Sequence, residues 1–263
     1  MTLKMSSVSV YASGVRLISN ISMECETGSV VGILGENGAG KSTVLNSLSG
    51  ANVPDAGRVT LSDHLMSRYS LTELASRRAV LPQSSDLSFP LNAIEVVRLA
   101  LSMASYPHQK QDALLMRCLN QFGVSHLADR SYPNLSGGEK QRIQLARVLA
   151  QLKCHSSNER TDDQFLLLDE PISALDLHQQ FKTMRHIREL TKDGIGVVVI
   201  LHDLNLASMF CDHLIILKEG TLLTQGTPHE VITTNTINQA FDIDVDIALH
   251  PDTRTPFLTP RLL

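Results

Sequence analysis

The chain has 263 residues, of which 43% are hydrophobic and 19% are charged, as in an ordinary globular protein of one large domain or two small ones. The formal net charge of −4 gives no bulk attraction to nucleic acid or anionic lipid. No apolar run approaches the roughly 20 residues that span a bilayer, and the first ten residues lack the long apolar stretch of a secretion signal, so we expect a cytosolic protein.

The first expected elements are strands. Val8 and Val10 alternate with polar residues, Gly14 marks a turn, and alternation resumes near Ile18, which predicts an antiparallel hairpin. The continuous apolar run 30–34 is typical of a buried parallel strand. It leads into a glycine-rich loop and a helix expected near 41–48. Further strands are expected at 58–61 and 79–82.

The glycine-rich loop matches the phosphate-binding pattern G-x-x-x-x-G-K-S. Such a loop directs backbone N–H groups at phosphate oxygens, and the helix that follows adds its dipole. In this pattern the lysine contacts the β- and γ-phosphates and the serine hydroxyl binds Mg²⁺. The predicted nucleotide-binding residues of the loop are Gly35, Glu36, Asn37, Gly38, Ala39, Gly40, Lys41, Ser42 and Thr43.

The spacing of apolar residues changes after residue 84, where the continuous apolar runs of strands stop and helical spacing begins. Ile94, Val97 and Leu101 follow that spacing. We therefore expect a helical subdomain at about 84–151, inserted into a single domain of residues 1–263.

Strand texture returns at 165–168 and at 197–201, with a helix expected near 177–191 between them. This βαβ unit predicts a parallel sheet. Asp169 and Glu170 directly follow the first of these strands, at the edge where open α/β sheets bind ligands. Asp169 is predicted to hold Mg²⁺ through water, and Glu170 to polarise the attacking water.

The pentapeptide Leu135–Glu139 lies between the two halves of this site. Ser136 and Glu139 form a capping box at the start of a helix, but Gly137 and Gly138 are poor helix formers. Glycines there leave the helix N–H groups open to an anion. One chain then has two anion-binding helix tips and one hydrolytic centre, so we expect two chains to sandwich two nucleotides across a two-fold axis.

The last expected elements are a hairpin over 215–223, a short helix at 228–232 and weak strand signals beyond it. The polar segment 153–164 is expected to be a surface loop. The four cysteines, widely spaced and without a C-x-x-C pair, are expected to be reduced and to serve in packing.

In these motifs the chain resembles the ATP-binding cassette (ABC) ATPases over nearly its whole length. The resemblance implies the following roles. Tyr11, 24 residues before Gly35, would stack on adenine. Gln83 would contact Mg²⁺ and the attacking water, and His202 the γ-phosphate. Ser136, Gly137 and Gly138 belong to the ABC signature, and Ser173–Asp176 to a loop that crosses the dimer interface. Glu36 and Ile172 depart from the common residues of the family, Pro and Thr, without removing a phosphate or metal ligand.

Within this family the segment Ser88–Leu91, followed by Ile94–Val97, is similar to ATPases of importers for heme, iron-siderophores and cobalamin. The polar insertion 153–164 and the stretch Leu201–Ala207 are similar to those of the hemin import ATP-binding proteins, the HmuV family. Ala100 and Leu101 depart from the Gly-Arg of many such importers, which leaves siderophore or cobalamin as alternative cargo.

The resemblance implies an α/β fold: a P-loop ABC ATPase core with a mixed sheet, an N-terminal antiparallel β subdomain and an α-helical subdomain. It implies ATP and Mg²⁺ as cofactors. It also implies a homodimer that acts with two transmembrane permease subunits, and indirectly with a periplasmic substrate-binding protein, on the cytoplasmic face of the inner membrane. A soluble ABC ATPase of iron–sulfur cluster assembly is an alternative of another class. No nucleic-acid partner is expected.

Overall fold

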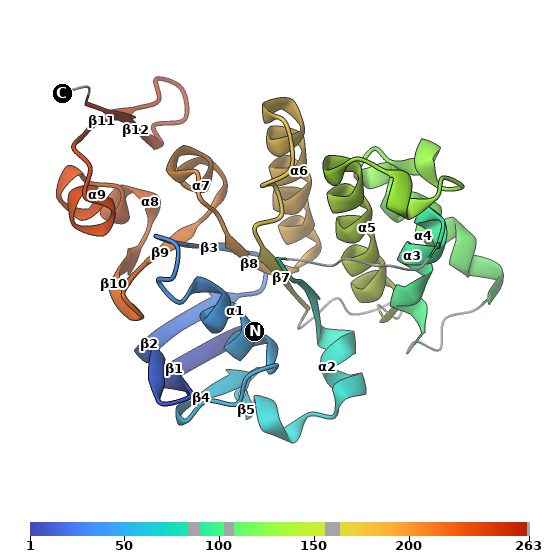
Figure 1. Ribbon diagram of the computed structural model, residues 1–263, viewed down its shortest axis with the longest axis horizontal. Helices are drawn as coiled ribbons and strands as arrows, with labels where there is room; N and C mark the ends of the chain where they lie inside the picture. The colour runs from blue at the N-terminus through green and yellow to red at the C-terminus, as the bar shows by residue number, and fades with distance from the viewer. Residues whose placement is uncertain (84–89, 103–107, 156–163, 262–263) are drawn as a thin grey trace.

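The computed structural model describes residues 1–83, 90–102, 108–155 and 164–261. Its strands form three sheets, with the orders β2-β1-β4-β5, β10-β9-β3-β8-β7-β6 and β11-β12 (Figure 1). The strands are β1 (Thr2–Ala12), β2 (Val15–Glu26), β3 (Val30–Gly35), β4 (Ala56–Leu61), β5 (His64–Leu65), β6 (Arg78–Leu81), β7 (Phe165–Asp169), β8 (Gly196–Ile200), β9 (His213–Lys218), β10 (Thr221–Gly226), β11 (Val245–Leu249) and β12 (Pro256–Pro260).

The α-helices of the described residues lie mostly on one side of the central sheet (Figure 1). They are α1 (Lys41–Ser49), α2 (Leu71–Arg77), α3 (Ala93–Arg98), α4 (His108–Gln121), α5 (Gly137–His155), α6 (Leu177–Leu190), α7 (Leu204–Phe210), α8 (Pro228–Val231) and α9 (Thr234–Phe241). Helix α2, which we did not expect, begins at a capping box of Ser70 and Glu73.

The N-terminal hairpin is confirmed. Strands β1 and β2 pair antiparallel, and β4 joins the other edge of β1. Val8 and Ile18 are fully buried on the inner face of this sheet, where they join a core that also includes α1 and one face of the central sheet. The alternation in the sequence is irregular because the pairing of β1 with β2 shifts register three times, after Met5, after Val8 and after Val10.

The central sheet is mixed, as predicted: five strands run parallel, and β10 pairs antiparallel at one edge. Strand β3 shows why such strands read as continuous apolar runs. Its Val30 and Leu34 face the helical layer, while Val31 and Ile33 face the core beneath the N-terminal sheet. Because the parallel strands share one direction, their carboxyl ends meet at one edge, where β3 and β7 deliver their following loops.

Helices α3, α4 and α5 occupy the region expected to be helical (Figure 1). The described residues between 90 and 155 contain only one β-bridge, Asn92 with Ser131, and the subdomain boundaries 84–151 stay a prediction. Ser88 and Phe89 and residues 156–163 of the polar insertion lie outside the described residues. The predicted loop at 153–164 was wrong at its start, since α5 continues to His155.

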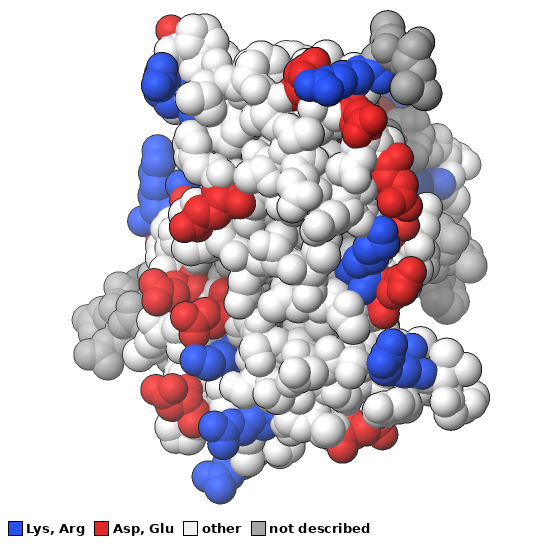
Figure 2. Space-filling model, turned by 90° about the vertical axis from the view of Figure 1, so that its left-hand side faces the viewer, with Lys and Arg blue, Asp and Glu red and all other residues white. Residues whose placement is uncertain are grey.

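The C-terminal part contains the expected hairpin and short helix, and the weak strand signals beyond them correspond to the hairpin β11–β12. Helix α9 was not expected. Helix α9 is amphipathic, with Ile237 and Ala240 buried. On the face that includes this region, acidic and basic side chains surround a largely uncharged area (Figure 2). None of the helices in the described ranges has the length and apolar character needed to cross a bilayer.

Candidate nucleotide-hydrolysis site

The phosphate loop joins the end of β3 to the start of α1. Gly40 caps α1 at a φ of 97°, and a Cβ there would lie 2.6 Å from Ile18 Cγ2, so a side chain is excluded by both conformation and space. The side chain of Lys41 is folded back over the loop. Its Nζ donates to the carbonyl oxygens of Gly35 and Glu36, each at 2.8 Å. The loop therefore places the Lys41 ammonium group beside the backbone N–H groups at the start of α1.

Lys41 is only 6% exposed. Burial lowers the pKa of its ammonium group, while the carboxylates of Glu170 and Asp169 act in the opposite direction. The loop and the two acidic residues are thus one electrostatic unit, although 128 residues separate Lys41 from Asp169 in the chain.

Asp169 is the last residue of β7 and is 5% exposed. Burial raises the pKa of its carboxyl group, and a hydrogen bond from the Ser42 hydroxyl partly offsets that rise. Within the described residues its Oδ1 is buried without a hydrogen-bond partner. An unsatisfied carboxylate oxygen beside a hydroxyl is a donor set that suits a hard divalent cation, so these residues fit Mg²⁺.

Glu170 follows Asp169 in a strained backbone conformation, with a φ of 49°. Its Oε1 lies 2.7 Å from His202 Nε2 and accepts a hydrogen bond from Gln83 Nε2 at 3.3 Å. The backbone carbonyl of Glu170 is held as well: Gln141 Nε2 donates to it at 3.2 Å and Ser173 Oγ at 3.1 Å. Three residues distant in the chain, Gln83, Gln141 and His202, thus contact either the carboxylate or the backbone carbonyl of Glu170.

A cavity of about 950 Å³ lies over these groups. Among the predicted residues, its lining includes Asn37, Gly38, Gly40, Lys41, Ser42, Thr43, Gln83, Glu170 and His202. Asp169 and Ala39 are buried and do not line this cavity. Glu36 lines a neighbouring cavity that also contacts His202.

Tyr11 does not line this cavity. It is 50% exposed and pairs with Arg16 across the β1–β2 hairpin. The wall on that side is formed by Val15, Arg16 and Leu17, and by Glu219 and Gly220 of the β9–β10 turn. Neither segment carried a phosphate-binding pattern. Their only signals were the turn glycines Gly14 and Gly220, which indicate hairpins and not a ligand site.

The signature forms a capped helix tip, as its sequence predicts. Ser136 Oγ accepts from the Glu139 backbone N–H at 3.4 Å, and Glu139 Oε2 accepts from the Ser136 N–H at 2.8 Å. A Cβ on Gly138 would lie 3.1 Å from the Ala174 carbonyl oxygen, so the tip packs closely on the segment 173–176. Among the described residues, none of the signature lines the cavity that contains Lys41.

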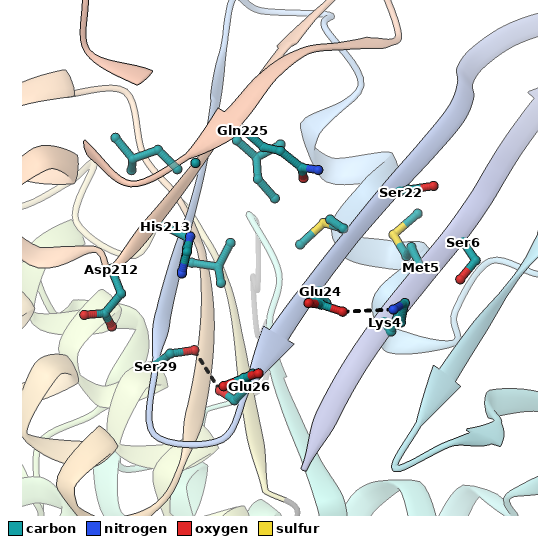
Figure 3. A pocket seen from close by; sticks show the side chains of 15 residues that line it. Lys4, Met5, Ser6, Ser22, Glu24, Glu26, Ser29, Asp212, His213 and Gln225 are labelled. Carbon is teal, nitrogen blue, oxygen red and sulfur yellow. Dashed lines mark hydrogen bonds and ion pairs between the residues drawn. The ribbon is translucent and has the colours of Figure 1, made fainter. Parts of the chain in front are cut away.

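A second cavity, of about 570 Å³, lies between the N-terminal sheet and strands β9 and β10 (Figure 3). Its polar lining includes the ion pair of Lys4 with Glu24, at 3.0 Å, and Asp212 and His213. It contains no phosphate loop and none of the predicted site residues. The residues predicted for nucleotide hydrolysis therefore line the cavity over Lys41 and Glu170 and not this one.

Comparisons with known proteins agree with this geometry. The profile of the ABC transporter family matches residues 18–173. The chain is 42% identical to the Hemin import ATP-binding protein HmuV of Bordetella pertussis, over 95% of this chain and 96% of that one. It is 37% identical to the protein of the same name from Rhizobium meliloti, over 98% of each chain.

Two solved structures are similar to it. One is an inward-facing putative metal-chelate type ABC transporter, with a TM-score of 0.80 and 22% identity over 99% of this chain and 98% of that one. The other is MJ0796, a bacterial ABC transporter cassette solved as a dimer, with a TM-score of 0.74 and 27% identity over 86% and 98%. The ABC ATPase fold is thereby confirmed. The chain belongs to the ABC transporter family as an HmuV-like ATP-binding subunit, an enzyme that couples ATP hydrolysis to transport.

Proposed function

We propose that Glu170 is the general base of hydrolysis and that His202 and Gln83 orient it and the reacting groups. The support is the convergence of both side chains on Glu170 Oε1, at 2.7 and 3.3 Å, beside the cation of Lys41. A base within hydrogen-bond reach of its water contributes about 10²- to 10⁴-fold to the rate. Lys41 and the loop N–H groups hold the phosphates against the base.

Ser42, Asp169 and Gln83 would hold Mg²⁺, which neutralises phosphate charge when it is bound. The support is the buried Oδ1 of Asp169, which lacks a partner among the described residues, and its neighbour Ser42. Tyr11 stays our prediction for the adenine contact, although in this structure the adjacent wall of the cavity is Val15–Leu17.

We infer that the working form is a homodimer in which Ser136, Gly137 and Gly138 of each chain contact the γ-phosphate held by the other. The signature tip lies outside the cavity of its own chain, yet it is built as an open helix start. The signature forms the N-terminus of the 19-residue helix α5, away from the nucleotide of its own chain. This N-terminus can bind a phosphate if another subunit supplies it.

We propose that the transported cargo is hemin, taken up through two separate transmembrane permease subunits, and that this ATPase binds them at the cytoplasmic face of the inner membrane. A periplasmic binding protein would deliver the hemin to them. The observation that supports hemin as the cargo is the identity of 37–42% with Hemin import ATP-binding proteins over almost the whole chain. The ATPase itself would not bind hemin.

The test is reconstitution in liposomes of this chain with the permease and the binding protein encoded beside it. ATP turnover and uptake of labelled hemin, a ferric siderophore and cobalamin are measured in parallel. Hemin alone should stimulate turnover and accumulate, and the Glu170→Gln variant should support neither. Uptake of only the siderophore or cobalamin would overturn the hemin assignment. Affinity capture that recovers only soluble iron–sulfur scaffold proteins, with no permease, would overturn transport altogether.

A further inference from the structure

The C-terminal segment 234–260, which comprises α9, β11 and β12, lies beside the helix that follows His202. Strand β12 packs on α7, and Figure 1 shows the hairpin next to that helix. Helix α7 begins two residues after His202, and Asp203 caps it by accepting from the N–H groups of Asn205 and Leu206 at 2.8 and 2.9 Å. The His202 backbone therefore lies between the end of β8, at Ile200, and the start of α7, and the position of α7 constrains it from the C-terminal side.

Asn205 joins α7 to β12 through both ends of its amide. Its Oδ1 accepts from the Leu258 N–H at 2.8 Å, and its Nδ2 donates to the Leu258 carbonyl at 3.2 Å. The two bonds engage both the N–H and the carbonyl of Leu258, as a neighbouring β-strand would. They specify both the distance and the orientation of α7, which apolar packing alone does not.

A second bond lies one turn further along the helix. Ser208, which is 1% exposed, donates from Oγ to the Pro256 carbonyl at 2.5 Å. Asn205 and Ser208 are three residues apart and so share one face of α7. That face is polar where a helix packed on a core is usually apolar, and both side chains are satisfied by the backbone of β12.

The same C-terminal segment reaches the nucleotide side of His202. Phe241, at the end of α9, lines a cavity of about 540 Å³ together with Glu36, Asn37 and His202. His202 therefore has the C-terminal segment on two sides: β12 behind the helix that follows it, and α9 across the cavity from it. The family profile matches residues 18–173 of this chain, and this range does not include the C-terminal segment.

We propose that Asn205 is a positioning residue for hydrolysis. It fixes α7 on the C-terminal hairpin and thereby holds His202 against Glu170 and the nucleotide. The segment 234–260 is then a functional part of the ATPase and not an appendage. This inference rests on the role proposed above for His202, and it names a residue that acts through His202 without contacting ATP.

The test is a double-mutant cycle in the full chain: wild type, Asn205→Ala, His202→Ala and the double variant, each followed by single-turnover ATP hydrolysis. The matched control is Asn238→Ala, which removes an amide hydrogen bond to Asp244 at 2.9 Å, a bond that lies within the same segment and does not involve α7. Because we expect low residual rates with His202→Ala, affinities for ATP and ADP are also measured, in the Glu170→Gln background.

Asn205→Ala should lower the single-turnover rate by about fivefold, the equivalent of one neutral hydrogen bond. It should have no further effect when His202 is already alanine. The preference for ATP over ADP should fall in parallel, and Asn238→Ala should match wild type. If Asn205→Ala does not fold, Asn205→Asp replaces it in the cycle, since it keeps the acceptor for the Leu258 N–H and loses the donor.

Equal losses in the presence and absence of His202 would overturn the inference, as would an unchanged rate and preference in Asn205→Ala. These outcomes differ from a failure of the proposed function. If His202→Ala alone retains wild-type turnover, the role of His202 in hydrolysis is wrong. If His202→Ala loses turnover and Asn205→Ala does not, only the positioning role of Asn205 is wrong.

Discussion

The replacement Glu170→Gln removes the ability of residue 170 to accept a proton while keeping the hydrogen bonds that its side chain accepts. The Glu170 side chain is 16% exposed, and its Oε1 faces His202 Nε2 at 2.7 Å and Gln83 Nε2 at 3.3 Å. A glutamine has the same length, and its carbonyl oxygen can accept from both partners. The strained peptide at φ 49° keeps its bonds from Gln141 and Ser173, since these involve the backbone carbonyl.

The variant therefore loses proton acceptance and little else. Loss of a positioned base costs about 10²- to 10⁴-fold in rate, which corresponds to about 2.7–5.5 kcal/mol in the activation barrier. We expect kcat to fall within this range while ATP affinity stays close to that of wild type. Because ATP then persists at both sites of the proposed dimer, the variant should also accumulate as an ATP-bound dimer.

The assay combines single-turnover hydrolysis with sedimentation of the protein in the presence of ATP or ADP. The matched control is Glu189→Gln, which alters another glutamate beside a histidine, His186 at 3.2 Å, outside the cavity. The control should turn over at the wild-type rate. Hydrolysis by Glu170→Gln within about threefold of wild type, far less than a base contributes, would show that Glu170 is not the base.

Three further predictions concern the dimer, the signature helix and the fold. Ser136→Arg should abolish hydrolysis but leave ATP binding by the monomer intact. Mixing this variant with Lys41→Ala should restore part of the activity, because one of the two sites in a mixed dimer then has both an intact phosphate loop and an intact signature. Mixtures as inactive as the separate variants would contradict the sandwich dimer. Gln141→Leu should lower kcat about five- to tenfold without changing ATP affinity, because it removes the donor to the Glu170 carbonyl; a change confined to affinity would refute this. Asp212→Asn should lower the free energy of unfolding at pH 7 by about 1–3 kcal/mol, as measured by urea titration. Burial raises the pKa of the Asp212 carboxyl, but hydrogen bonds from Arg188 and the Val30 N–H lower it more. The stabilisation should therefore be present above pH 3.8 and disappear as pH falls through the lower folded pKa; a difference between variant and wild type that persists at acid pH would be inconsistent with this account.

Local features were predictable because their physical causes lie within a few residues. The phosphate loop, the acidic pair after β7 and the capping box at Ser136 each follow from short-range spacing. The same is true of β3, whose apolar run reflects burial on both faces. Helix α9 also has a local signal, Ile237 and Ala240 after a Thr233 cap, but this signal spans only eight residues and we did not predict the helix.

The arrangement of the site came from the order of the strands. Gln83 and Glu170 are 87 residues apart, and they meet because β6 and β7 are parallel neighbours. His202 reaches Glu170 because β8 lies on the other side of β7. No spacing along the chain encodes these neighbours. They depend on which buried strands pair, and the whole core decides that pairing.

The sequence by itself therefore determined the chemistry of this protein, a phosphate loop with an acidic pair and a second open helix tip. Only the tertiary structure decided which groups contact Glu170 and that Val15–Leu17, and not Tyr11, line the cavity. It alone decided that Asn205 ties α7 to β12. The reason is physical: hydrophobic periodicity and capping act over one or two turns, whereas these contacts join side chains whose separation along the chain carries no information about their distance in space.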